Sequence, residues 1–162
     1  MTCKIIDKFL SQKEFDPLER YMMGYYFPWF YMDKESYETE TDTFQFQHTF
    51  YRLGEKPSEY YELVKPILRK LNVEEKNLHR IKAILTPKTS EHRFSGYHID
   101  YKDMTTVAFY VNTNNGYTEF QKGAKVKSVA NRAAIFDSNL VHGGHTATDQ
   151  KTRVMINFNY EI

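Results

Sequence analysis

Short β-rich runs follow one another along the second half of the chain, and they constrain the fold more than any other feature. The runs are Arg80–Leu85, Thr105–Val111, Tyr117–Phe120, Val126–Val129, Ala133–Phe136 and Val154–Tyr160. Gly, Asn, Asp and Pro punctuate the gaps between them, as at Asn114-Asn-Gly116 and Gly143-Gly144. Short strands separated by turn residues are typical of a sandwich, a barrel or a jelly roll. We therefore expect a mainly β fold.

The N-terminal part predicts a helix between Ser11 and Met23. Ser11 and Glu14 have the spacing of a capping box, and Gly24 provides a stop. The apolar face of this helix consists of Phe15, Leu18 and Met22. Pro17 fits only the first turn of a helix, so the helix is expected to begin a few residues after Ser11.

A second helix is predicted from about Ser58 to Leu71. Its apolar face consists of Tyr61, Val64, Leu68 and Leu71. Pro66 lies inside this pattern and should kink the helix or split it in two. No domain boundary is evident, so we expect one domain over residues 1–162. Residues 1–78 would supply helices and loops that support the substrate side, and residues 79–162 would form the β core with the metal site.

Aromatic residues are unusually frequent, at 16% of the chain, and more than half of them lie within the first 60 residues. The run Tyr25–Tyr31 either belongs to a core of large side chains or lines a substrate cleft. The polar, acidic residues 32–43 predict a loop, and a loop of this length is often functional; it would close over a substrate. The alternating run Phe44–Phe50 predicts a strand.

Composition excludes several classes of protein. No apolar run approaches the ~20 residues of a membrane span, and the N-terminus carries charges where a signal peptide would be apolar, so we expect a cytoplasmic protein. Cys3 is the only cysteine, which leaves His, Asp and Glu to hold any metal ion. The net charge of +1 gives no electrostatic indication of a nucleic-acid partner. Nothing in the sequence indicates an oligomeric state.

Three residues are candidate metal ligands. In an extended segment, residues i and i+2 point the same way, so His98 and Asp100 could bind one ion together. His142 ends the apolar run that begins at Ala133, where a buried strand is expected to emerge into a glycine turn. Two histidines and one carboxylate on one face suit Fe(II) enzymes with open coordination positions. His145 lies three residues further on and could replace His142.

The last predicted strand has two different faces. Val154, Ile156, Phe158 and Tyr160 alternate with Arg153, Met155, Asn157 and Asn159. If the second face is buried, its cation and amides need partners, and a guanidinium is well shaped to bind a carboxylate. The alternative is a polar face exposed at a sheet edge.

These features occur in one order: an HxD pair, strands separated by a glycine-containing turn, a histidine, about a dozen residues, then an arginine that begins the last strand. In this order the chain resembles the 2-oxoglutarate/Fe(II) dioxygenases, especially the prolyl 4-hydroxylase branch, over residues 80–162. The resemblance implies a double-stranded β-helix (jelly roll) in which His98, Asp100 and His142 bind Fe(II). Arg153 would pair with the distal carboxylate of 2-oxoglutarate. The family's spacing to this arginine favours His142 over His145.

The resemblance also implies further co-substrate contacts. Tyr110 corresponds to a tyrosine that contacts the same distal carboxylate, Thr118 would face the co-substrate, and Asn157 falls near the iron. Three segments look most like small single-domain oxygenases of bacteria and marine phages, which implies the cytoplasm of a bacterial or phage-infected cell. These segments begin at Asn114, Asn131 and Asn157. His92 and Arg93 receive no role.

The implied activity is hydroxylation of a peptidyl proline or a related peptide side chain, with a small-molecule substrate as the other option. It would consume 2-oxoglutarate and O₂ at Fe(II), with ascorbate as an optional reductant. Two rivals remain open. One is a non-enzymatic jelly-roll module of a binding or phage structural type, and the other is a cupin-like metalloenzyme that does not use 2-oxoglutarate.

Overall fold

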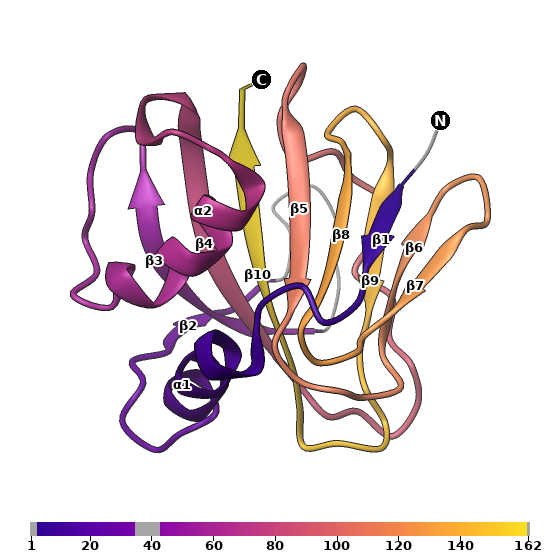
Figure 1. Ribbon diagram of the computed structural model, residues 1–162. Helices are drawn as coiled ribbons and strands as arrows, with labels where there is room; N and C mark the ends of the chain where they lie inside the picture. Colours follow the sequence, from indigo (N-terminus) through magenta and orange to yellow (C-terminus); the bar gives the residue numbers. More distant parts are fainter. Residues whose placement is uncertain (1–2, 35–42, 162) are drawn as a thin grey trace.

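Two antiparallel sheets form the framework of the computed structural model, which describes residues 3–34 and 43–161 (Figure 1). The larger sheet has the strand order β1-β8-β5-β10-β4-β3-β2, and the smaller sheet has the order β7-β6-β9. The large sheet consists of β1 (Lys4–Ile6), β2 (Phe30–Met32), β3 (Gln45–Arg52), β4 (Leu78–Pro87), β5 (Thr105–Tyr110), β8 (Arg132–Asp137) and β10 (Thr152–Tyr160). The small sheet consists of β6 (Tyr117–Phe120), β7 (Lys125–Lys127) and β9 (His142–His145).

From β4 onward the chain passes back and forth between the two sheets. It leaves the large sheet after β5 for β6 and β7, returns for β8, crosses again for β9 and ends in β10. This path is that of a jelly roll, so the predicted fold class is confirmed. Strand β10 lies at the centre of the large sheet between β5 and β4. Its two faces are both buried, one by the helices and the N-terminal segment and the other by residues of the small sheet.

The large sheet has an apolar core on each side. On one side, residues such as Phe109, Ile156 and Phe158 pack with the helices and the N-terminal segment. On the other side, Tyr110 and Met155 belong to a smaller cluster that faces the small sheet. Strand alternation separates the two clusters, because neighbouring residues of one strand point to opposite faces. The polar members of the inner face can therefore meet inside the roll.

The helices pack on the outer face of the large sheet (Figure 1). They are α1 (Gln12–Met22) and α2 (Lys65–Leu71), with short 3₁₀ helices η1 (Tyr61–Val64) and η2 (Glu75–Asn77). The predicted apolar face of α1 is buried, and the ring of Phe15 meets that of Phe109 at 6.2 Å between centroids. No helix in the described part of the chain is long and apolar enough to cross a membrane.

The prolines act differently from one another. Pro66 splits the second predicted helix into η1 and α2, as expected, and lies in the first turn of α2. The expected late start of α1 is wrong, because α1 begins at Gln12 and Pro17 is inside it. The Glu14 carboxylate accepts hydrogen bonds from the backbone N–H and hydroxyl of Ser11. This early start also lets the helix bury its first apolar residue, Phe15.

The aromatic run near the N-terminus is divided between core and surface. Phe27 is buried and Trp29 packs against the core, whereas Tyr25 and Tyr26 are almost fully exposed. Strand β2 begins at Phe30 and pairs with β3. Of the predicted loop over residues 32–43, positions 35–42 lie outside the described residues.

Candidate metal centre and co-substrate cavity

A pair of backbone hydrogen bonds joins the two candidate histidine ligands. The N–H of His98 donates to the carbonyl of His142 at 2.9 Å, and the N–H of His142 donates back at 3.0 Å. This exchange places the two imidazole rings side by side, with centroids 4.8 Å apart. The HxD segment is thus held by an isolated bridge to β9 rather than by a strand of its own.

The expected position of His142 in its strand is wrong. The apolar run from Ala133 does not continue to it, because β8 ends at Asp137 and a turn follows. His142 is the first residue of β9, and the glycines after it are part of this strand. The short strand forms because it pairs with β6, with His142 opposite Phe120.

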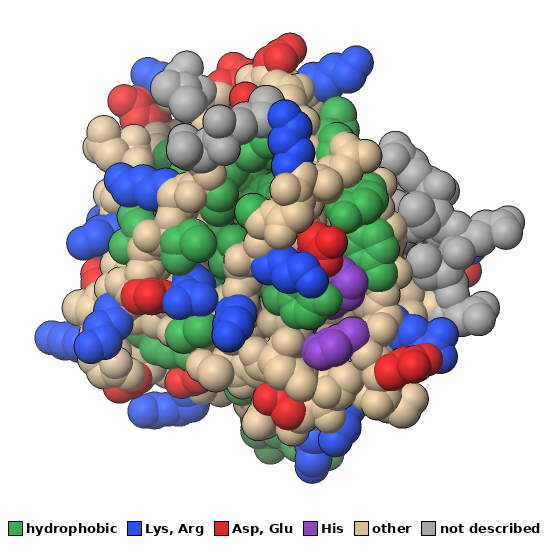
Figure 2. Space-filling view, turned by 90° about the vertical axis from the view of Figure 1, so that its right-hand side faces the viewer, with side chains coloured by type: hydrophobic (Ala, Val, Ile, Leu, Met, Phe, Trp, Pro, Cys, Tyr) green, Lys and Arg blue, Asp and Glu red, His purple; other side chains and the backbone are tan. Residues whose placement is uncertain are grey.

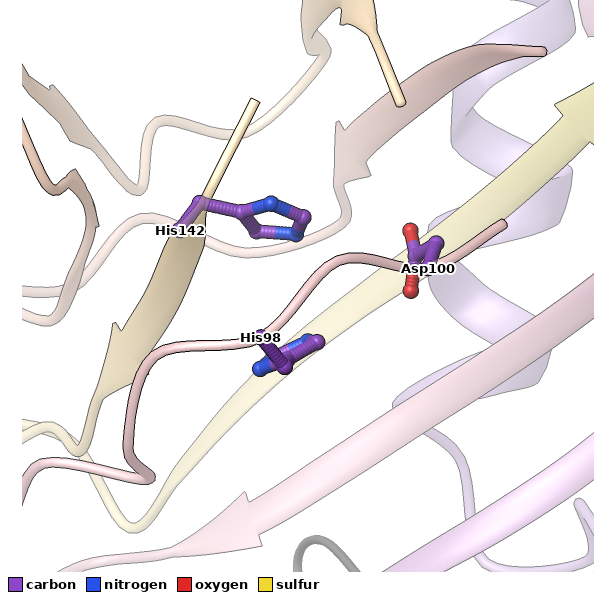
Figure 3. A group of neighbouring side chains, drawn as sticks. All are labelled: His98, Asp100 and His142. Carbon is purple, nitrogen blue, oxygen red and sulfur yellow. The ribbon is translucent and has the colours of Figure 1, made fainter. Parts of the chain in front are cut away.

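His98, Asp100 and His142 surround one space (Figure 3). Each offers one ligand atom, and these atoms all lie within 4.8 Å of one another. Two imidazoles and one carboxylate are the donor set of Fe(II) sites that keep open coordination positions. The group therefore fits Fe(II) by its chemistry and by its convergence.

The Asp100 carboxylate is held by three donors. The Arg80 guanidinium lies 3.4 Å from Oδ1, while the Asn159 amide and the Thr106 hydroxyl donate to Oδ2 at 3.2 and 3.3 Å. Burial alone would raise the pKa of Asp100, but charge interactions with His142, Arg80 and His98 and the hydrogen bond from Asn159 lower it overall. The carboxylate is thus ionised and oriented before any metal binds.

The two histidines are also oriented through their Nδ1 atoms. Nδ1 of His142 lies 2.8 Å from the Leu140 carbonyl, and Nδ1 of His98 lies 3.3 Å from the Gly96 carbonyl. Such a contact fixes the tautomer with hydrogen on Nδ1 and leaves Nε2 free to bind a metal. Burial lowers the pKa of His142, which keeps its ring neutral at pH 7.

His145, the other candidate for the third ligand, is not part of this group. Its ring is stacked between those of Phe94 and Tyr117, at 4.6 and 4.2 Å between centroids. Its Nε2 lies 3.1 Å from a carboxylate oxygen of Glu119 but without hydrogen-bond geometry. Figure 2 shows the side of the molecule that carries the small sheet, where histidine, acidic and basic side chains gather.

Arg153 lies in the interior of the roll with only 4% of its surface exposed. Its Nε donates to the Ser128 hydroxyl and one terminal nitrogen donates to the Thr118 hydroxyl, both at 3.0 Å. The Tyr110 hydroxyl also donates to Thr118, at 2.8 Å. The alternative of an exposed polar edge is wrong, because Arg153, Asn157 and Asn159 are all buried.

A glycine makes room for the guanidinium. A Cβ at Gly116 would lie 2.7 Å from Cδ of Arg153, which is closer than real side-chain contacts. A side chain at Gly116 would therefore displace Arg153 from its position.

One cavity connects the metal group with Arg153. It is lined by Gln45, Lys82, Ile84, Thr86, Ser95, His98, Asp100, Ala108, Thr118, His142, Gly144, His145, Thr146, Arg153, Met155 and Asn157. The candidate site residues from three parts of the sequence thus share one space. Tyr110 is fully buried beside it and contacts the lining through Thr118. His92 and Arg93 do not line it.

Sequence reasoning missed several residues of this cavity, and Lys82 is the most important. Burial lowers the pKa of Lys82 to about 8, and the nearby Arg80 adds to this effect. The signal was present in the sequence. In the run from Arg80, basic and apolar residues alternate, which places Lys82 on the face opposite to Ile81 and Ala83.

No family model matches the chain, and no curated protein matches it. Solved structures do. An oxidoreductase of the 2OG-Fe(II) oxygenase family from Burkholderia pseudomallei superposes with a TM-score of 0.68, at 11% identity, over 98% of this chain and 84% of that protein. The chain has the fold of the 2-oxoglutarate/Fe(II) oxygenases.

Two further structures extend this likeness of fold. A prolyl-4-hydroxylase from Pseudomonas putida gives a TM-score of 0.61 at 15% identity, over 99% of this chain and 92% of that protein. A prolyl hydroxylase from Trichoplax adhaerens, in complex with a hypoxia inducible factor oxygen degradation domain peptide fragment, gives 0.62 at 12% identity, over 98% and 83%. The oxygenase fold thus extends over nearly the whole chain.

Proposed function

We propose that the protein is an Fe(II)- and 2-oxoglutarate-dependent oxygenase. One observation carries the proposal: a convergent His-Asp-His group and a buried arginine line the same cavity. The iron and 2-oxoglutarate, when bound, would activate O₂. In the overall reaction, 2-oxoglutarate and O₂ convert a substrate C–H group to C–OH and release succinate and CO₂.

The metal would be held by His98, Asp100 and His142. The three ligand side chains would be oriented for the metal in advance, because a backbone bridge fixes the two histidines and three donors fix the carboxylate. Neutral imidazoles and an ionised carboxylate are the forms that bind a metal ion.

The distal carboxylate of 2-oxoglutarate would bind Arg153. A charge-assisted contact in an interior position is strong and directional, and the Thr118 hydroxyl lies beside the guanidinium to add a donor. Tyr110 would act through Thr118, whose hydroxyl it already contacts. Asn157 lies on the same strand four residues further on, toward the metal group, where its side chain would contact the bound ligands.

We further propose a peptidyl proline or a related peptide side chain as the substrate class. The support is the fold shared with two prolyl hydroxylases, one of which was solved with a peptide. The reaction would take place in the cytoplasm, and ascorbate would serve as an optional reductant.

An anaerobic titration with Fe(II) and 2-oxoglutarate tests the activity class. The wild-type protein should develop the weak visible charge-transfer band of an iron-bound 2-oxo acid. Asp100→Ala should lose the band and tight metal binding. Arg153→Ala should keep metal binding. The 2-oxoglutarate concentration that gives half of the maximal band should rise by about a hundredfold or more, because a buried charge-assisted contact is removed. Lys127→Gln, which removes an exposed lysine of β7, serves as the control.

Each contrary result points to a rival function. Metal binding with no response to 2-oxoglutarate would favour a cupin-like metalloenzyme. No metal binding at all would favour a non-enzymatic jelly-roll module.

A further inference from the structure

Strand β4 places basic side chains on the inner face of the large sheet. Its outer-face residues Ile81 and Ala83 are fully buried in the core, so Arg80 and Lys82 point to the opposite face. Lys82 lines the cavity together with His98, Asp100 and Asn157. A lysine ammonium therefore lies in the space that adjoins the proposed metal site.

Lys82 is too far from Arg153 for both side chains to bind the same carboxylate. In the sheet register, Arg153 lies opposite Thr86 and Asn157 lies opposite Lys82. Four residues of strand separate the two positions, or about 13 Å at the usual rise per residue. A five-carbon dicarboxylate held at one end by Arg153 does not extend that far beyond the metal. Lys82 would thus lie beyond the reach of a co-substrate held by Arg153, in the part of the cavity left for the primary substrate.

The charges of the cavity are unbalanced in favour of cations. Among the described residues that line it, Asp100 is the only acid. With the site loaded, one carboxylate of 2-oxoglutarate would pair with Arg153, and the other would neutralise the iron together with Asp100. Arg80 would still face Asp100, whereas Lys82 would remain without an ion-pair partner of its own. Arg52, which lies opposite Arg80 in the register, adds another positive charge nearby.

Lys82 has no hydrogen bond or ion pair to any residue within the described ranges. Burying an ammonium group in this way is unfavourable unless a ligand completes its surroundings. The lowered pKa of about 8 reflects that unfavourable burial. At neutral pH most of the side chain is still protonated, so it is a cation with no direct ion-pair partner among the described residues. The Asp100 charge favours its protonated form, but that carboxylate already faces Arg80.

We propose that Lys82 is a specificity-determining residue that binds a carboxylate of the primary substrate. The proposal rests on the proposed oxygenase function and narrows its substrate class. A carboxylate fits better than a phosphate, because Arg80 is already engaged with Asp100 and a single ammonium matches a single negative charge. The carboxylate comes either from a free amino acid or from an acidic side chain in a peptide.

Matched ligand pairs test the proposal by binding alone. Protein loaded with Mn(II) and saturating 2-oxoglutarate is titrated calorimetrically, which blocks the Arg153 end and prevents turnover. The free amino-acid pairs are L-proline with L-prolinamide and L-glutamate with L-glutamine. The peptide pair is a capped peptide with Glu next to Pro and the same peptide with Gln. The two arms distinguish the sources of the carboxylate.

In at least one pair, the carboxylate member should bind wild type about tenfold or more tightly than the partner in which that carboxylate is an amide, as expected for a desolvated charge pair. Lys82→Met should remove this difference, and Lys127→Gln should retain it. The proposal is overturned if no pair shows the difference or if Lys82→Met keeps it.

The iron–2-oxoglutarate band separates this proposal from the proposed function. Lys82→Met should develop the same band as wild type, which also shows that the variant is folded. If wild type lacks the band, the oxygenase assignment fails. If the band is present in both proteins while the carboxylate preference is absent or unaffected, only the role of Lys82 fails.

Discussion

The Asp100 carboxylate shows how much of the candidate site depends on residues that do not bind the metal themselves. Asn159 donates to Asp100 and also to the Thr106 hydroxyl, at 3.2 and 3.0 Å. We expect Asn159→Ala to weaken metal binding by about 10- to 100-fold, the usual effect of losing a group that orients a ligand. Chelator competition with Mn(II) or Zn(II) measures the change. Asn139→Ala, at an exposed asparagine, should leave the affinity unaltered, and equal affinities for both variants would contradict the prediction.

The two histidines of β9 should behave in opposite ways. His142→Gln should abolish tight metal binding, because the variant keeps the backbone bridge but lacks the imidazole. His145→Gln should leave the metal dissociation constant nearly unchanged, since that ring packs between Phe94 and Tyr117. Weaker metal binding by His145→Gln than by His142→Gln would reverse the assignment of the third ligand.

At this scale, sequence reasoning reached the residues that carry distinctive chemistry. The spacing of His98 and Asp100 and the alternation around Arg153 marked them as candidates, and the resemblance to the 2-oxoglutarate/Fe(II) dioxygenases supplied their expected roles. The contacts of Asn159 were not predictable, because they depend on the register that places Asn159 opposite Thr106 on β5. Register depends on how the strands pair in the assembled sheet and cannot be predicted from the sequence of either strand alone.

At the scale of elements, the strands with clear β-rich runs were predictable, and three short strands without such runs were not. Strands β5, β6 and β10 lie close to their expected positions. Strands β1, β2 and β9 were missed, because they are short and their sequences lack a β-rich run bounded by turn residues. Strand β9 has the sequence His-Gly-Gly-His, which has low strand propensity. It is extended because β6 pairs along its whole length.

Lys82 on strand β4, which lines the cavity, is expected to lower the free energy of unfolding. The pKa of Lys82 is lowered to about 8 in the folded protein, from 10.5. Below pH 8 the folded state carries the full free-energy penalty of holding the partly buried Lys82 as a cation. Between pH 8 and 10.5 the unfolded chain holds more protons, so the free energy of unfolding rises with pH in that window.

We therefore expect Lys82→Met to raise the free energy of unfolding at pH 7 by about 2 kcal/mol, with allowance for the water that reaches the cavity. The gain should shrink as the pH rises from 8 toward 10.5. Urea unfolding of the metal-free protein at pH 7 and at pH 10 measures both values. A gain that is independent of pH would mean that packing, and not charge, causes it.

At the scale of the whole molecule, the large sheet separates a structural core from the site. Phe109 points to the outer side, where its ring meets Phe9 and Phe15 at 6.1 and 6.2 Å. We expect Phe109→Ala to lower the free energy of unfolding by about 3–5 kcal/mol, as for other buried aromatic truncations. Urea unfolding measures this loss.

Under conditions in which circular dichroism shows Phe109→Ala to be folded, this variant should bind metal as tightly as wild type, because the cavity lies on the other face of the sheet. A folded Phe109→Ala protein with impaired metal affinity would show that the two faces are coupled.

The backbone bridge between His98 and His142 has a practical consequence. Because main-chain hydrogen bonds, and not the ion, hold the two rings together, the ligand geometry already exists in the metal-free protein. A chelator should strip the ion without unfolding the chain, and metal added back should enter in one kinetic step with no slow conformational phase. Preparations purified without iron should thus regain full occupancy by simple mixing under anaerobic conditions.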